Sequence, residues 1–188
     1  MCRLRPGARL AERQAASGNN EVVTLMHSTD PQKSLAAALG RIPSGLFILT
    51  VANQTIETGM LASWVQQCSF VPPMITFVIQ RGRAIADLLT NDSPFTLNIL
   101  EAAQTDMIAH FGKGFSLKDD AFAKLDVQRD PRKQCGPVLT EALAYLQGKV
   151  LQRLPAGDHE LFLAEVTAGA LLDDGQPMVH IRKNGMHY

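Results

Sequence analysis

The sequence predicts a mainly β fold, in which an antiparallel sheet closes on itself and a few short helices accompany it. Runs of apolar and β-branched residues of strand length recur along the chain. Turn sequences, rather than long helical crossovers, separate most of these runs. The chain has 188 residues, 46% of them hydrophobic, which is enough for one domain with a sizeable core.

Composition and charge exclude several classes of function. The 18 Lys and Arg residues balance 18 Asp and Glu residues, so the formal net charge is zero. This balance predicts no general attraction to nucleic acid or to an anionic membrane surface. No apolar run approaches the length of a membrane span, so the sequence predicts no transmembrane segment.

The three cysteines are Cys2, Cys68 and Cys135, which are far apart and form no Cys-x-x-Cys pair. Their pattern argues against a disulfide framework and against a zinc site, and it predicts a reducing, cytoplasmic location. Cys68 lies within a polar stretch, where it is either a reactive thiol or a small packed residue, and we favour packing.

Residues 1–26 are predicted to form a poorly ordered tail, and residues 27–188 one folded domain. The tail starts with several arginines and continues through Ser17-Gly18-Asn19-Asn20, without the apolar core of a secretory signal. An arginine-rich start is also compatible with a weak organelle-targeting signal or with a misassigned start codon. We favour the tail.

The folded part is predicted to open with a short helix followed by two strands. Asp30 is the expected N-cap, Pro31 the first helical residue and Gly40 the residue that ends the helix. The two strands are expected at residues 46–51 and 55–58, where β-branched and apolar residues dominate.

The later elements follow the same alternation of apolar runs and turns. Short helices are expected at residues 84–90 and 103–111, and residues 112–137 are expected to be irregular. The last three strands are predicted to form a meander, with a turn at residues 155–158. The remaining strands are expected at residues 74–79, 95–100, 143–154, 160–168 and 178–181.

Residues 59–73 are unusual for a strand because small and polar residues are concentrated there. Buried polar groups need partners, so these residues face water, satisfy one another or bind a polar ligand. The small residues would let a flat molecule approach the backbone closely. An ordinary edge strand with a polar outer face explains the stretch equally well. The residues concerned are Gly59, Ala62, Ser63, Gln66, Gln67, Cys68 and Ser69, followed by Pro72-Pro73.

Arg81 and Arg83 flank Gly82 where a predicted strand ends and a predicted helix begins. Glycine permits close approach, a helix N-terminus offers N–H donors, and arginine binds phosphate in bidentate fashion, so this is a candidate anion site. A solvated surface pair is an equally good interpretation from the sequence.

Other catalytic patterns are weak or absent. Gly112-Lys113-Gly114 lacks the further residues of a nucleotide-binding loop, so we interpret it as flexible backbone. No Gly-x-Ser-x-Gly is present, and the histidines show no recognised metal-ligand spacing, so no metal site is predicted. His159 lies at a predicted turn, and turns at the mouth of a barrel tend to carry ligand-contacting side chains.

Taken together, several segments resemble the flavin reductase-like, FMN-binding split-barrel family. The segment Leu61-Ala62-Ser63-Trp64-Val65 is most similar to the flavin reductase-like domain at the C-terminal end of flavodiiron proteins. The resemblance covers residues 39–188 and rests on segments in the expected order. These are Pro43-Ser44-Gly45, Gly59-Met60-Leu61-Ala62-Ser63 with Ser69 and Pro72-Pro73, Arg83-Ala84-Ile85, residues 95–100, Gly157-Asp158-His159 and residues 182–188.

The resemblance implies an FMN-binding split β-barrel, a Greek-key antiparallel fold, that works as a homodimer with the flavin near the interface. It implies NAD(P)H:flavin oxidoreductase activity, with FMN or FAD as cofactor, NAD(P)H as co-substrate and hydride passing to flavin N5. His159 would be a catalytic contact to the nicotinamide. The implied cofactor-binding residues are Met60, Leu61, Ala62, Ser63 and Trp64 at the isoalloxazine ring, Cys68 and Ser69 along the ring or ribityl chain, and Arg81 and Arg83 at the phosphate.

The sequence also departs from the family pattern. Many reductases have threonine at the position of Leu61. Leucine lacks the threonine hydroxyl, which could contact flavin, although the flavodiiron-type variant shares this change. No flavodiiron catalytic domains precede this segment in the sequence, which predicts a stand-alone relative. An alternative function is an FMN-binding electron-transfer flavoprotein that serves a redox partner protein without its own NAD(P)H turnover. A split barrel that has lost its ligand is a third possibility.

Overall fold

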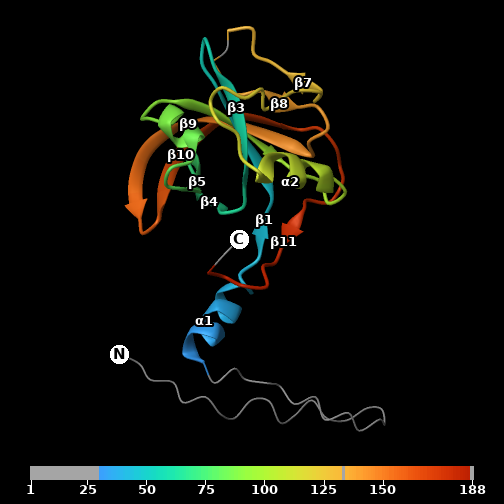
Figure 1. Cartoon of the computed structure of the whole chain (residues 1–188). Helices are drawn as coiled ribbons and strands as arrows, with labels where there is room; N and C mark the ends of the chain where they lie inside the picture. The colour runs from blue at the N-terminus through green and yellow to red at the C-terminus, as the bar shows by residue number, and fades with distance from the viewer. Residues whose placement is uncertain (1–29, 133, 187–188) are drawn as a thin grey trace.

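Seven antiparallel strands form one curved sheet in the computed structural model, which describes residues 30–132 and 134–186 (Figure 1). The strand order is β3-β2-β6-β9-β10-β5-β4. The prediction of a mainly β, antiparallel fold with few short helices is therefore confirmed. The strands are β2 (Phe47–Ala52), β3 (Glu57–Ala62), β4 (Val65–Phe70), β5 (Pro73–Gln80), β6 (Pro94–Ile99), β9 (Ala144–Ala156) and β10 (His159–Leu171).

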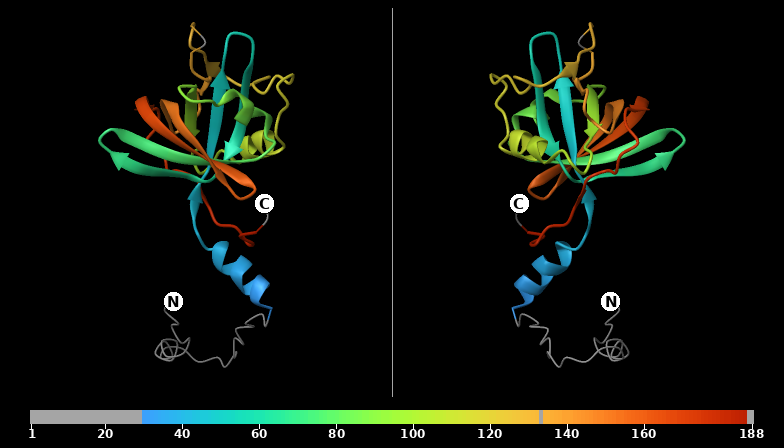
Figure 2. Two further views of the ribbon diagram at one scale, coloured as in Figure 1. Left: turned by 90° about the vertical axis from the view of Figure 1, so that its left-hand side faces the viewer. Right: turned by 90° about the vertical axis from the view of Figure 1, so that its right-hand side faces the viewer.

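Two short ladders and three short helices complete the described chain. Strand β1 (Ser44–Gly45) pairs with β11 (Val179–His180), and β7 (Val127–Gln128) pairs with β8 (Val138–Leu139). Figures 1 and 2 show α1 and the β1–β11 ladder on one side of the barrel, with α1 farthest from it. Among the described residues, no helix is long and apolar enough to cross a membrane. The helices are α1 (Pro31–Leu39), the 3-10 helix η1 (Ala84–Leu88) and α2 (Thr105–Gly112).

Helix α1 begins and ends where the sequence predicts. The Asp30 carboxylate accepts a hydrogen bond from the Gln32 amide at 2.9 Å, and Pro31 occupies the first turn. At the other end, the Gly40 amide donates to the Ala36 carbonyl at 3.0 Å. The Gly185 amide also donates to Ala36, at 2.7 Å, so the C-terminal segment is tied to the end of α1.

The split in the barrel lies between β3 and β4, the two outermost strands of the sheet. These strands are consecutive in the chain, and only Ser63 and Trp64 connect them. The Trp64 carbonyl accepts a hydrogen bond from the Val78 amide at 3.0 Å, which fixes this corner against β5. The polar stretch noted in the sequence therefore turns the chain from one sheet edge to the other.

Strand β2 is buried on both faces, as its nearly continuous apolar sequence predicts. Alternate residues of a strand point to opposite faces, so β2 serves two separate cores. Leu49 packs inside the barrel with Phe77 and Phe162, whose rings stack at 5.1 Å. Ile48 packs with the residues that α2 and the following loop contribute.

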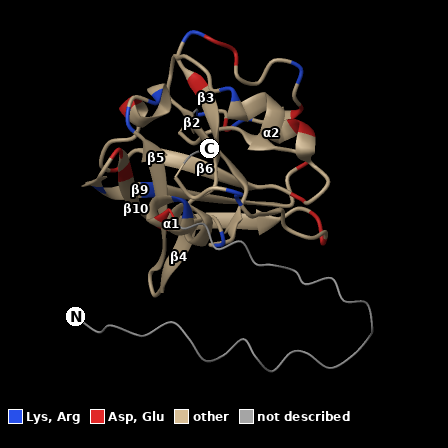
Figure 3. Cartoon of the chain, turned by 60° about the horizontal axis from the view of Figure 1, so that its bottom comes forward, with Lys and Arg blue, Asp and Glu red and all other residues tan. Residues whose placement is uncertain are grey.

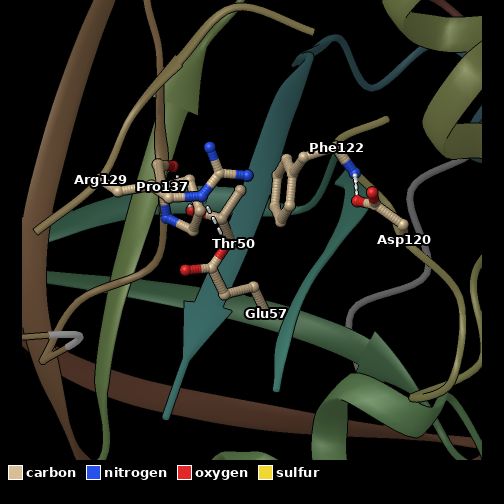
Figure 4. A network of polar contacts seen from close by, with 6 residues as sticks. All are labelled: Thr50, Glu57, Asp120, Phe122, Arg129 and Pro137. Carbon is tan, nitrogen blue, oxygen red and sulfur yellow. Dashed lines mark hydrogen bonds and ion pairs between the residues drawn. The ribbon is translucent and has the colours of Figure 1, made fainter. Parts of the chain in front are cut away.

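Residues 127–132 and 134–139 form a strap that lies over β2 and β6. The Thr50 hydroxyl donates to the Pro137 carbonyl at 2.7 Å, and the Asn98 side chain, fully buried, accepts from the Leu139 amide at 2.8 Å. Figure 4 shows Thr50 directed at Pro137 and the Arg129 guanidinium directed at Glu57, to which it donates at 2.8 Å. Buried polar groups of the sheet are thus satisfied by the strap.

Three details of the predicted elements were wrong, whereas the short helix expected at residues 84–90 is present as the 3-10 helix η1 at Ala84–Leu88. The last strand, β11, pairs with β1 rather than extending a meander, because residues 172–177 cross to Glu101, which bridges Pro177. Strand β9 runs to Ala156, so the hairpin turn contains only two residues. A short strand, β7, lies within the segment expected to be irregular.

Residues 1–26, the predicted tail, lie outside the described residues, and the boundary at residue 27 stays a prediction. Over the described chain, basic and acidic residues are interspersed in the view of Figure 3. This distribution agrees with the zero formal net charge.

Candidate functional site

Two cavities meet at the corner between β3 and β4. The inner cavity, of about 240 Å³, is lined by residues of β3, β5, α2 and β11. The outer cavity, of about 520 Å³, is lined by residues of β1, β5 and β11 and by the corner itself. Ser63 and Val78 line both, so the two cavities adjoin each other there.

Strand β5 supplies one wall of both cavities, because its side chains point alternately into the barrel core and toward the cavities. Ile75, Phe77 and Ile79 point into the barrel core. The intervening residues point to the opposite face. Along that face, Thr76 lines the outer cavity, Val78 lines both cavities and Gln80 lines the inner one. The chain then bends at Gly82, whose φ is +84°, and brings Arg83 to the inner cavity.

Ser63 and Arg83 are two of the polar residues that line the mostly apolar inner cavity. The Ser63 hydroxyl is buried and has no hydrogen-bond partner within residues 30–132 and 134–186. Arg83 has no ion pair with a carboxylate of residues 30–132 or 134–186. Because buried polar groups are normally satisfied, these two side chains indicate a polar ligand that carries negative charge.

The glycine loop after α2 takes part in the site, which its sequence did not predict. Gly112 lines the inner cavity. Gly114 has a φ of +77°, and a Cβ on it would lie 2.8 Å from a guanidinium nitrogen of Arg83. Glycine at this position therefore leaves room for the Arg83 side chain as well as permitting the backbone conformation.

Trp64 lies between the outer cavity and a second polar group. Its ring is 4.8 Å from the His159 imidazole, and the Arg182 guanidinium lies 5.0 Å from its centre. His159 is only 8% exposed and lines neither cavity, while its Nε2 is buried and has no hydrogen-bond partner in the part of the chain that the structure describes. Its Nδ1 lies 2.8 Å from an Asp158 carboxylate oxygen. This hydrogen bond lowers the pKa of Asp158 below its ordinary value.

The structure brings together six of the ten residues that the sequence singled out. Met60, Leu61, Ala62, Ser63 and Arg83 line the inner cavity, and Ser63 and Trp64 line the outer cavity. His159 lies behind Trp64.

Besides His159, three predicted residues lie outside both cavities. Cys68 is exposed and Ser69 half-buried on β4, the edge strand, and neither lines a cavity. Arg81 is exposed. Hydrogen bonds with His159 and Arg153 lower the pKa values of Asp158 and Glu160, respectively, and the charge of Arg81 adds to this effect.

Sequence reasoning missed several lining residues. Gln80 could have been found from strand alternation, and Gly112 from the glycine loop. His180 gave no local signal, because only the pairing of β11 with β1 brings it to the inner cavity. No cluster of three or more His, Cys, Asp or Glu residues suited to a metal occurs in the described part of the chain.

Two proteins of Synechocystis sp. from the diflavin flavoprotein A series are similar to this chain. They are 44% and 39% identical to it over 152 and 156 residues, which is 80% and 82% of this chain. The chain spans about a quarter of their length, 25% and 27%.

Solved structures show the same fold. The NADH:FAD oxidoreductase SgcE6 of Streptomyces globisporus superimposes with a TM-score of 0.70 at 24% identity, covering 77% of this chain and 85% of that one. BorF, the flavin reductase component of a bacterial two-component tryptophan halogenase, has a TM-score of 0.70 at 21% identity, covering 81% and 94%. The family model described as "Flavin reductase like domain" matches residues 39–187. The chain belongs to the flavin reductase-like family.

Proposed function

We propose that this chain binds FMN at the two adjoining cavities and transfers a hydride from NAD(P)H to the bound flavin. The observation that carries the proposal is that Ser63 and Arg83 line one mostly apolar cavity, where the described chain gives the Ser63 hydroxyl no hydrogen-bond partner and Arg83 no carboxylate partner. FMN combines a flat apolar ring, a polar ring edge and an anionic phosphate, and the lining offers a counterpart to each.

In this proposal the residues of Met60 to Ser63 hold the ring, and Arg83 binds the phosphate beside the glycine loop. The bound flavin supplies the hydride-accepting chemistry. The protein binds the two substrates next to each other and keeps water away. FAD could use the same ring site, since its isoalloxazine ring is identical.

Trp64 would form the wall of the outer cavity, where the nicotinamide enters. His159 does not line that cavity, so we assign it a positioning role, in which it holds the indole from behind. Asp158 keeps the His159 ring in its orientation through the hydrogen bond to Nδ1.

The proposal is tested with the chain's single tryptophan. Trp64 lines the outer cavity, so adding FMN is expected to quench its fluorescence in a saturable way. Adding NADH or NADPH to the complex without oxygen should then bleach the flavin absorbance in a stopped-flow experiment. Absence of saturable quenching would overturn the binding site, and binding without bleaching by either nucleotide would overturn the hydride transfer.

Electron transfer to a redox partner protein is the second candidate. The relatives are named diflavin flavoproteins and are about four times as long as the matching segment, so there the segment is one part of a larger flavoprotein. In this alternative, FMN would still quench Trp64, but its electrons would come from another protein domain. Bound flavin that neither nicotinamide nucleotide bleaches would favour this function.

We also propose that a second copy of the chain covers the outer cavity. Ile42 and Val179 line it and are 61% and 66% exposed, and Ile181 and Met186 on the same C-terminal segment are 56% and 57% exposed. Apolar side chains gathered at the rim of a ligand site are typical of an interface. A homodimer would bury them and close the site.

Val179→Asp is therefore expected to shift the protein from dimer to monomer, because a carboxylate is costly to bury in an apolar interface. Sedimentation velocity at several protein concentrations measures this. The matched control is Val71→Asp, at a hairpin tip where Val71 is 93% exposed, which should leave the dimer intact. A dimer that survives Val179→Asp, or a monomeric unmodified protein, would contradict the proposed interface.

A further inference from the structure

The C-terminal segment crosses the two cavities at the corner formed by Ser63 and Trp64. Three successive contacts show this. Val179 lines the outer cavity together with Trp64, and His180 lines the inner cavity together with Ser63. The Arg182 guanidinium then lies 5.0 Å from the centre of the Trp64 ring. The segment therefore runs alongside the corner.

The backbone holds His180 in this position. Met178, which is buried, donates its amide to the Leu100 carbonyl at 2.9 Å and accepts from the Leu46 amide at 3.2 Å. His180 itself is paired with Ser44 in the β1–β11 ladder. Neighbouring residues of a strand point to opposite sides, which is why Val179 reaches the outer cavity and His180 the inner one.

His180 follows Val179, which lines the outer cavity, so we infer that His180 reaches the inner cavity at the end that adjoins the outer one, with Arg83 toward the other end. Ser63 and Val78 are the residues that line both cavities, so the cavities adjoin at these two residues. Strand β11 contributes Val179 to the outer cavity and His180 to the inner one, so it passes the inner cavity at this shared end. Along β5, Val78 is followed by Gln80, and Arg83 comes after the end of the strand. The chain therefore leads from the shared end at Val78 toward Arg83. In the proposed function this is the end that holds the flavin ring, and Arg83 marks the phosphate end.

We propose that His180 stabilises the reduced flavin and so sets the balance between the oxidised and reduced cofactor. This inference rests on the proposed function. A hydride carries one proton and two electrons from the dihydronicotinamide, so a neutral oxidised ring becomes an anion. A donor N–H at the ring end favours that anion over the neutral ring. Among the described residues, those that line the inner cavity include no carboxylate that would oppose this effect.

The test is the ratio of the dissociation constants of oxidised and reduced FMN, both measured by quenching of Trp64 fluorescence. Reduced FMN is prepared with dithionite under anaerobic conditions. His180→Phe should weaken the preference for the reduced form by about tenfold, the value of one hydrogen bond to a charged group. His180→Gln, which keeps an N–H donor and disturbs packing less, should have a smaller effect in the same direction.

Two further variants separate this role from general damage. His110→Gln changes a histidine that lines neither cavity, and should leave the ratio unchanged. Arg83→Gln should weaken the binding of oxidised and of reduced FMN by similar factors, because the phosphate is the same in both.

The outcomes distinguish this inference from the proposed function. If FMN binds and quenches Trp64 but both His180 variants keep the original ratio, the role of His180 is wrong and the flavin site stands. If the unmodified protein does not bind FMN, both proposals are wrong. Should His180→Phe not fold, His180→Gln decides the question on its own.

Discussion

Replacing Arg83 by alanine is expected to raise the dissociation constant for FMN roughly thirtyfold, as for loss of a hydrogen-bonded charge pair. Arg83 lines the inner cavity and has no carboxylate partner within the described chain, so its charge is available to an anionic ligand. Riboflavin lacks the phosphate, and its affinity should change little. Titration of Trp64 fluorescence with each compound measures both constants.

Two other arginines serve as matched controls for this prediction. Arg132→Ala removes an exposed arginine from the strap, outside both cavities, and should leave FMN affinity unchanged. Arg81→Ala should have a small effect, since Arg81 lies near the carboxylates of Asp158 and Glu160 rather than in a cavity. Equal losses in Arg83→Ala and Arg132→Ala would show that the phosphate site is misplaced. A larger loss of FMN affinity in Arg81→Ala than in Arg83→Ala would indicate that Arg81, rather than Arg83, binds the phosphate.

Replacing Asn98 by alanine is expected to lower the free energy of unfolding by about 3 kcal/mol, as for loss of a buried, fully bonded polar side chain. Asn98 is completely buried on β6. Its side chain donates to the Ile48 carbonyl at 3.2 Å and to the Pro137 carbonyl at 3.4 Å, and accepts from the Leu139 amide. Alanine would leave these backbone groups unpaired where water does not reach them.

Urea denaturation, followed by Trp64 fluorescence and by circular dichroism, measures this loss. Asn91→Ala is the control, because Asn91 is exposed in a turn and should change the free energy of unfolding by less than about 0.5 kcal/mol. The strap would not stabilise the sheet as described if both variants unfolded at the same urea concentration.

The local elements were predictable because short-range rules decide them. The Asp30-Pro31 start and Gly40 end of α1 depend only on capping within one turn. The longer apolar strands follow from apolar runs, and the helix expected at residues 103–111 follows from helical periodicity; it is observed as α2, with Met107 and Phe111 buried. The antiparallel class follows from the turns between the strands.

Apart from Arg83, the predicted residues that line a cavity lie in one continuous stretch. Met60 to Trp64 form the corner between β3 and β4, so their role as a group is visible in the sequence. Cys68 and Ser69 belong to the same stretch, but β4 carries them along the sheet edge and away from the cavities. Arg81 and Arg83 look equivalent in sequence, and only the bend at Gly82 separates them.

By itself, the sequence determined the fold class, the ends of α1 and the longer apolar strands, because each depends on residues close together in the chain. The tertiary structure alone decided that β11 pairs with β1, that His180 joins Ser63 in one cavity and that Gly114 leaves room for Arg83. These contacts join segments separated by 31 to about 136 residues, and no local periodicity encodes which distant strands pair.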